Sequence, residues 1–264
     1  MIKNYLKIAW RSLLKNKVSS VINITGLALG LATSIIIMLV VLKEFSYDKF
    51  NAHFDDIYLL MKNQKEMDGI STGSSTAGPM AATFRDELPE TKYAARVSFF
   101  GNQIMKAGDK TIYESGMYAE PDIFNIMSFP AVQGNPVTAL QDPNTVVITE
   151  HTAKKFFGDE NPMGKIIVAD VKNTFRVGAV IKDIPTNSTL QFDMVFPFSF
   201  YALSNEWLNK WDDNRIPDLG AVEAGSKHRF RKCKTNKAVA ATLQRHYCFP
   251  VRLSAQQAEI APQF

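Results

Sequence analysis

An uninterrupted apolar run near the N-terminus is the feature that most constrains this chain. Residues 18–42 read VSSVINITGLALGLATSIIIMLVVL and hold no charged side chain across 25 positions. As a helix the run is about 37 Å long, which exceeds the ~30 Å hydrocarbon core of a bilayer. A backbone inside lipid must satisfy its own hydrogen bonds, so the run predicts one transmembrane helix.

The charges on either side of the run indicate its orientation. The 17 residues before it carry five basic groups and no acid, whereas Lys43 and Glu44 cancel after it. The positive-inside rule therefore predicts a cytoplasmic N-terminus and places the chain after Leu42 outside. A cleaved secretory signal is the alternative, but its apolar region is about 7 to 15 residues long and ends at small residues. The longer run here favours an uncleaved anchor.

The segment before the run has the pattern of a helix that lies on the membrane surface. Apolar and basic residues alternate at helical spacing over residues 2–14. We expect Trp10 at headgroup depth, with Arg11, Lys15 and Lys17 at the membrane interface facing acidic lipid.

Small residues inside the run predict a face for helix packing. Gly26 and Gly30 are four residues apart, and Thr33 and Ser34 extend the face by one turn. Small residues allow a second helix to approach closely in lipid. A lone anchor needs no such face, so the pattern favours partner helices, although glycine is common in membrane helices by chance.

Charge is distributed unevenly along the rest of the chain. Residues 43–213 hold 16 basic and 23 acidic groups, while residues 214–264 hold nine basic and three acidic ones. The basic excess thus lies at the membrane and in the tail, so the overall charge of +4 does not indicate nucleic-acid binding. Both cysteines, Cys233 and Cys248, are in the tail, and their spacing matches no zinc finger.

Between the run and the tail, helical and strand patterns intermix without regular alternation, which predicts an α+β domain of two lobes over residues 43–213. The expected strands and helices are Asp55–Lys62, Ala77–Glu87 (helix), Tyr93–Phe100, a hairpin over 103–119, Asn144–Ile148, a helix from Thr149 to Gly158, Lys165–Val168, Thr174–Ile181 and Phe192–Phe198.

No motif in the chain indicates catalysis, a metal or a cofactor. The segment from Gly158 to Lys165 superficially resembles a phosphate-binding loop, but it has one residue too many between its glycines and Ile166 where Ser or Thr is needed. A turn between a helix and a strand explains it better. His53 and His151 are the histidines of the domain, and neither belongs to a recognisable catalytic pattern. We therefore expect no enzyme.

Several segments together resemble the N-terminal part of ABC transporter permeases of the MacB/FtsX type. The similarity covers about residues 1–213 and is carried by KIAWRSLLKNK, ITGLALGLA, FSYDKF, DDIYLL, VVITEHTAKKFFGDENPMGK and FRVGAVIKDIPTNSTLQFDMVFP. The resemblance implies one helix followed by a MacB-like periplasmic core domain, a dimer with other permease copies or halves, and a cytoplasmic ABC ATPase that drives movement. It also marks residues 47–50, 157–165 and 183–188 as structural signatures of the family.

The chain departs from the family after residue 213. The family has three more membrane helices there, and no second apolar run of 18 residues follows. From about Arg215 the sequence turns basic and loses any clear period. We expect a truncation or frameshift near residue 214, with a tail outside the folded domain; a genuine basic tail is the alternative.

The function predicted from the sequence is thus a permease subunit that couples a cytoplasmic ATPase to export or mechanotransmission outside the membrane, here in truncated form. A stand-alone membrane-anchored binding module is the second hypothesis, and an exported enzyme tethered by one helix is the third. The transported substrate cannot be read from these residues.

Overall fold

The computed structural model of the protein describes residues 2–66, 69–73, 75–87, 91–205, 208, 216–217 and 247–252. The chain divides into two compact units, Met1–Tyr47 and Asp48–Phe264, each described by itself. The helices are α1 (Ile2–Lys15), α2 (Lys17–Glu44), the 3-10 turn η1 (Phe54–Asp56), α3 (Met80–Glu87), α4 (Ile123–Ile126), α5 (Pro136–Ala139), α6 (Glu150–Phe157) and α7 (Phe198–Leu203). The strands are β1 (Tyr58–Glu66), β2 (Gly69–Gly73), β3 (Ser75–Thr76), β4 (Val97–Ala107), β5 (Lys110–Ala119), β6 (Ala131–Gly134), β7 (Thr145–Thr149), β8 (Ile166–Ala169), β9 (Asn173–Ile181), β10 (Met194–Pro197), β11 (Ile216–Pro217) and β12 (Tyr247–Arg252).

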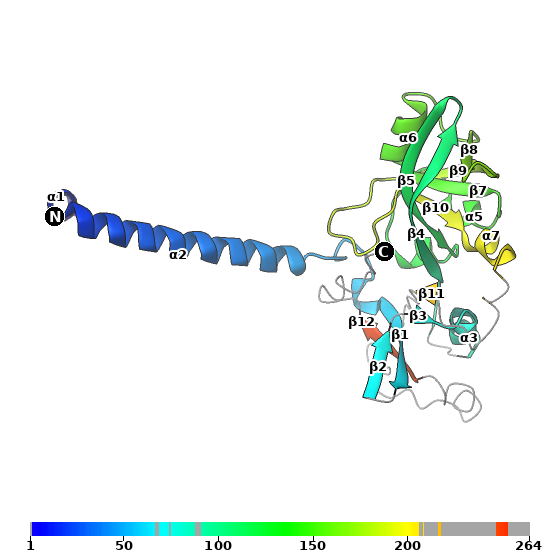
Figure 1. Cartoon of the computed structure of the whole chain (residues 1–264), viewed down its shortest axis with the longest axis horizontal. Helices are drawn as coiled ribbons and strands as arrows, with labels where there is room; N and C mark the ends of the chain where they lie inside the picture. The colour runs from blue at the N-terminus through cyan, green and yellow to red at the C-terminus, as the bar shows by residue number, and fades with distance from the viewer. Residues whose placement is uncertain are drawn as a thin grey trace. The chain divides into compact units, whose positions relative to one another are not determined.

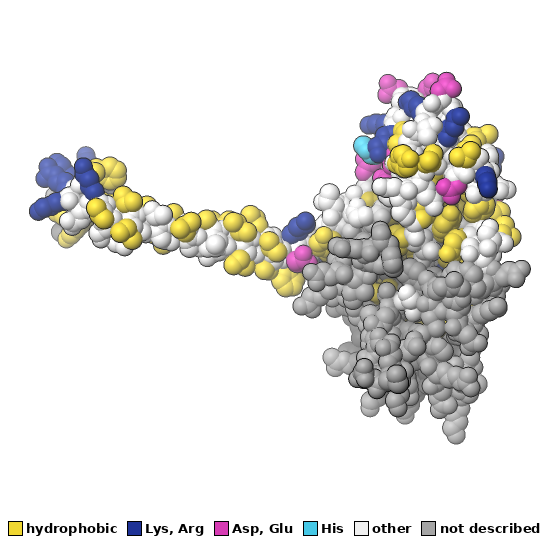
Figure 2. All heavy atoms as spheres, viewed as in Figure 1, with side chains coloured by type: hydrophobic (Ala, Val, Ile, Leu, Met, Phe, Trp, Pro, Cys, Tyr) yellow, Lys and Arg dark blue, Asp and Glu magenta, His cyan; other side chains and the backbone are white. Residues whose placement is uncertain are grey.

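The first unit consists of the two helices predicted from the sequence. They are separated at Asn16, whose φ of −108° and ψ of 59° are not helical, and the Ser20 hydroxyl donates a hydrogen bond to the Leu13 carbonyl across the break. Within the described part of the chain, α2 is the one helix long and apolar enough to cross a membrane. Its apolar side chains lie along an uncovered surface, with basic side chains gathered on α1 (Figure 2).

A mixed seven-stranded sheet forms the centre of the second unit (Figure 1). Its strand order is β6-β9-β7-β10-β5-β4-β8. The predicted hairpin is confirmed as β4 and β5, which turn at Gly108 with a φ of +57°. Strand β8 pairs with β4 along one edge and with β9 along the other, so the sheet returns on itself.

Two smaller sheets complete this unit. One has the order β12-β1-β2 and the other pairs β11 with β3. We expected the tail to lie outside the folded domain, and this is wrong for β11 and β12, whose backbones pair with domain strands. The edge of a strand such as β1 presents backbone N–H and C=O groups that can pair with another extended segment. Pairing through the backbone does not require the tail to have a periodic pattern of apolar residues. The other tail residues, Cys233 included, lie outside the described residues.

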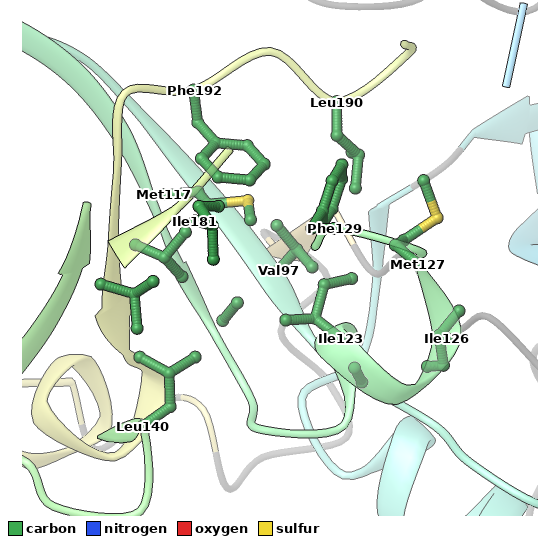
Figure 3. Packing of buried hydrophobic residues seen from close by; sticks show 14 of the residues in the cluster. Val97, Met117, Ile123, Ile126, Met127, Phe129, Leu140, Ile181, Leu190 and Phe192 are labelled. Atoms are coloured by element: carbon green, nitrogen blue, oxygen red, sulfur yellow. The ribbon is translucent and has the colours of Figure 1, made fainter. Parts of the chain in front are cut away.

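Residues on alternate faces of the seven-stranded sheet pack into two hydrophobic clusters. In β7, Val147 enters one cluster, while its neighbours Val146 and Ile148 enter the other. Strand side chains alternate between the faces, so a strand covered on both sides is apolar throughout, and all five residues of β7 are buried. Figure 3 shows the first cluster, in which Phe129, Leu190 and Phe192 pack beside Val97 and Met117.

Capping residues set the ends of α6 as the sequence predicts. The Thr149 hydroxyl accepts a hydrogen bond from the Thr152 N–H at the start, and Gly158 follows the helix with a φ of +63°. The next turn contains Lys165, whose ammonium binds the Glu160 carboxylate. The interpretation of this segment as a turn between helix and strand is therefore confirmed.

Three predicted elements begin at least three residues later than expected. The strand expected from Asp55 begins at Tyr58, because η1 occupies the preceding residues. The helix expected from Ala77 begins at Met80, after Pro79. The strand expected from Tyr93 begins at Val97, since the Arg96 N–H donates to the Glu120 carboxylate instead of a strand partner. The irregular residues before each of these elements are determined by features that the local pattern of apolar residues does not show.

Tight packing around Gly116 gives a stability prediction. A Cβ at this position in β5 would lie 2.5 Å from the Phe100 ring and 2.8 Å from the Met194 carbonyl oxygen. Gly116→Ala should therefore destabilise the domain by about 1 to 3 kcal/mol and lower its Tm by roughly 3 to 10 °C, measured by thermal unfolding of the full chain in detergent. Gly101→Ala, which meets nothing within 4 Å, is the matched control and should leave the Tm nearly unchanged. Equal shifts would contradict the packing argument.

Candidate functional site

Basic residues form a continuous stripe on α1. Lys3, Lys7, Arg11 and Lys15 follow one another at intervals of four, so they lie on neighbouring turns of one face, and all are exposed. Trp10 is also exposed, at 65%. Lys17 is the first residue of α2. The helix thus presents the cations that the sequence assigned to the membrane interface, and the interfacial role stays a prediction.

The predicted packing face of α2 is open and narrow. A Cβ at Gly26 or Gly30 would meet nothing within 4 Å. The Thr33 hydroxyl donates to the Leu29 carbonyl at 2.7 Å, and the Ser34 hydroxyl donates to the Gly30 carbonyl at 2.8 Å. Both hydroxyls donate to carbonyls of their own helix. The face that a neighbouring helix would meet therefore consists of small residues whose hydroxyl donors are already hydrogen-bonded. That such a neighbour packs there stays a prediction.

A buried carboxylate lies where the second unit begins. Asp48 is 2% exposed and has a left-handed φ of 55°. Its carboxylate accepts a hydrogen bond from the Thr189 N–H at 2.9 Å and another from the Thr189 hydroxyl. Its own N–H donates to the Asn187 carbonyl at 2.8 Å. The first residue of the unit is therefore bonded to a loop 141 positions later in the chain.

The following residues bind a second loop. The Asn51 amide donates to the Asp48 carbonyl at 2.9 Å, and its carbonyl oxygen accepts from the Ser128 N–H at 2.8 Å. In return, the Ser128 hydroxyl accepts from the Ala52 N–H at 3.0 Å. We call the set Asp48, Asn51, Ser128 and Thr189 the Asp48 clamp.

An aromatic contact supports the Asp48 clamp from the core side. Phe50 packs against the first hydrophobic cluster, with its ring centroid 6.0 Å from that of Phe129. The rings of Phe129 and Phe192 meet edge to face, with their centroids 5.3 Å apart. Figure 3 shows both side chains together with Leu190. The segment after the membrane helix is thus held by both hydrogen bonds and apolar burial.

The loop that receives Asp48 is itself well braced. The Gln191 amide donates to the carbonyls of Pro185 at 2.8 Å and Ser188 at 2.9 Å, and the Ser188 N–H donates to Pro185. The Ser188 hydroxyl, by contrast, is buried without a hydrogen-bond partner among the described residues. A buried hydroxyl without a partner has a desolvation cost of about 1 to 3 kcal/mol.

Of the four residues of the Asp48 clamp, the family resemblance marks only Asp48; it also marks the loop segment that ends just before Thr189. Residues 47–50 and 183–188 were marked as separate family signatures, while Asn51, Ser128 and Thr189 were missed. Polar residues capable of turn formation after a membrane helix were the available signal. Their partners lie 77 and 141 positions away, which no local pattern reveals.

Shifted pKa values are found away from the Asp48 clamp. A hydrogen bond from Lys165 lowers the pKa of the exposed Glu160 carboxyl. Burial raises the pKa of the Tyr118 phenol, and the charge of Asp170 raises it further. Among the described residues, no three side chains of the metal-binding types come together. The backbone N–H of His151 donates to the Asp183 carboxylate, a contact that belongs to the start of α6.

Comparison with protein families decides the identity of this architecture. Residues 20–222 match the MacB-like periplasmic core domain. The chain belongs to this family. The resemblance seen in the sequence is therefore confirmed, and the α+β unit after the apolar helix is a MacB-like periplasmic domain of the kind found in ABC-type transporter permeases. The family domain is not itself catalytic.

Several solved structures are similar to this chain. A domain of a protein described as a permease from Porphyromonas gingivalis has a TM-score of 0.62 and 25% identity, over 75% of this chain and 84% of that one. The periplasmic region of MacB from Actinobacillus actinomycetemcomitans gives 0.45 and 15%, over 76% and 91%. The extracellular domain of the ABC-type transporter YknZ from Gram-positive bacteria gives 0.49 and 13%, over 66% and 87%. The comparison with curated proteins found no match.

The basic stripe of α1 gives a prediction about lipid. With Trp207 and Trp211 changed to Phe, quenching of Trp10 by brominated lipid reports its depth. Quenching should be stronger in vesicles containing phosphatidylglycerol than in phosphatidylcholine, because each cation near an anionic surface contributes about 1 kcal/mol. Changing Lys7, Arg11 and Lys15 together to Gln should remove most of the difference.

The charge-preserving control for this experiment exchanges Lys and Arg at the same three positions. It should retain the preference for phosphatidylglycerol. If the Gln variant also retained it, the stripe would have no role at the membrane surface.

Proposed function

We propose that this MacB-like protein acts as a permease subunit of an ABC transporter of the MacB/FtsX type. A cytoplasmic ATPase in a partner subunit would displace the membrane helices, and the domain beyond the membrane would respond, in export or in mechanotransmission. The observation that carries the proposal is the family match, which runs without interruption from residue 20 in the apolar helix into the domain.

The contacts after the helix support this role. Hydrogen-bonded turns continue from α2 to Tyr47, whose N–H donates to the Glu44 carbonyl. The bonds of the domain begin at the next residue, Asp48. The hydrogen-bonded turns after the helix and the first hydrogen bonds of the domain are thus adjacent in the chain.

Partner helices are part of the proposal. The open face with Gly26, Gly30 and Thr33 suits close packing against another permease copy or permease half. The lipid partner is an acidic inner leaflet beneath α1, because its stripe of cations has the complementary charge.

Leucines on the small-residue face should separate these partners. We expect Gly26→Leu with Gly30→Leu to abolish co-purification of a second, differently tagged copy and of an ABC ATPase from the native membrane, while membrane insertion stays intact. The added side chains would hold a neighbouring backbone away. Quantitative mass spectrometry after mild crosslinking measures both partners.

The matched control is Ala28→Leu with Ala32→Leu, which adds similar bulk to the opposite side of α2, where both alanines are also exposed. It should leave both partners in place. Loss of partners in the control as well, or their retention in the glycine variant, would refute the packing face.

Orientation of the domain is proposed from the basic excess before α2. In a variant with Cys233 and Cys248 changed to Ser, Ser71→Cys should react with an impermeant thiol reagent in intact spheroplasts. Ser12→Cys should react only after lysis, because it lies on the cytoplasmic side. Labelling at position 71 only after lysis would place the domain in the cytoplasm and overturn the proposal.

A groove on the domain supports the second candidate function, an anchored binding module. It has a volume of about 530 Å³ and lies beside the β4–β5 hairpin, with Ile104, Ile166, Val168 and Val171 on its walls. Val171 is 80% exposed at a left-handed φ of 61°, which is unusual for a β-branched residue. The co-purification experiment separates the two candidates, since a binding module requires no ATPase.

A further inference from the structure

Two energetically unfavourable features lie at and beside the Asp48 clamp. Asp48 has the left-handed backbone that side chains avoid, and the neighbouring Ser188 hydroxyl is buried without a partner among the described residues. The first is a sparsely populated backbone conformation, and the second has a desolvation cost. Such strain persists only where surrounding contacts enforce it, and it concentrates at switch regions and functional sites.

The contacts that hold Asp48 in this conformation lead from the start of the domain to the centre of the sheet. Thr189 precedes Leu190 and Phe192, which are buried in the first hydrophobic cluster. The next residue, Asp193, binds the Ser115 hydroxyl at 2.7 Å, and β10 then begins at Met194. Strand β10 lies between β7 and β5. Five residues, from Thr189 to Asp193, thus connect the Asp48 carboxylate to a central strand.

We propose that Asp48 is the positioning residue through which a displacement of the membrane helix reaches the loop 185–192 and strand β10. The carboxylate is suited to this role because it accepts hydrogen bonds from both the N–H and the hydroxyl of Thr189. Two bonds to one residue fix the orientation of the loop as well as its distance from Asp48. Asn51 and Ser128 hold the other side of the same segment, so that it moves as one piece. This inference rests on the proposed function.

Bilayer thickness provides a displacement that needs no ATPase. Helix α2 has 28 residues and is long enough to change its tilt between thin and thick membranes. We expect hydrogen exchange of the loop 185–192 to differ at least about threefold between full-length protein in phosphatidylcholine of about 14-carbon chains and in phosphatidylcholine of about 20-carbon chains. Mass spectrometry of the loop peptide measures it.

Three variants of Asp48 separate the carboxylate from the backbone strain. Asp48→Asn tolerates the left-handed backbone, keeps an acceptor for the Thr189 N–H and has an amide group that can donate to the Thr189 hydroxyl, so it should keep the thickness dependence. Asp48→Gly relieves the strain but removes the bonds to Thr189, so exchange should no longer depend on thickness. Asp48→Ala should also lose the dependence. If the Ala variant fails to fold, Thr189→Val tests the hydroxyl alone and should reduce the dependence.

Asp193→Ala is the matched control. Like Asp48, Asp193 accepts from both the hydroxyl and the N–H of one residue, Ser115, but it lies beyond the loop. The Asp193→Ala variant should lower the Tm and still show a threefold dependence of exchange on bilayer thickness. If Asp48 had a purely structural role, the Asp48 and Asp193 variants would affect this dependence equally. The inference is overturned if the wild-type loop ignores thickness, or if the Gly variant still responds.

Failure of this inference can be distinguished from failure of the proposed function. Failure to find an ATPase partner would remove the transporter role and leave the thickness dependence unchanged. Loss of the thickness dependence with intact co-purification would instead locate the coupling at another part of the chain.

Discussion

Burial of the seven-stranded sheet on both of its faces is the constraint on which the rest of the domain depends. Adjacent residues of β7 enter different hydrophobic clusters, so a displacement of this strand would disturb both. The loops that carry Phe129, Leu190 and Phe192 are fixed because their side chains close one of these clusters. The Asp48 clamp exists because these same loops present their backbone groups to the residues after the membrane helix.

This arrangement suits the polar contacts of the clamp to the positioning role that we propose for Asp48. Hydrogen bonds between neutral groups contribute little net free energy, whereas a buried carboxylate demands partners and therefore determines where the chain must lie. Asp48 finds both of its protein donors on Thr189. A packed core responds to displacement by moving discrete elements, which is the property a mechanically coupled domain needs.

The features of α1 and α2 are local in the chain, unlike the contacts of the Asp48 clamp. The apolar length of α2, the stripe of cations on α1 and the small residues at Gly26 and Gly30 are all local patterns, and the structure shows each of them exposed and available. Their roles concern lipid and neighbouring helices. They can therefore be tested by changing charge or bulk on one face while the opposite face serves as the control.

The sequence by itself determined the apolar helix, the α+β class, the β4–β5 hairpin, the caps of α6 and the family, because each depends on residues close together in the chain or on a fixed order of segments. Tertiary structure alone decided the pairing of β8 with β4, the pairing of β12 with β1, and the Asp48 clamp. Those features join backbone and side-chain groups separated by many tens of residues. Burial makes such groups bind whichever partner the completed fold brings near, and no local spacing encodes that partner.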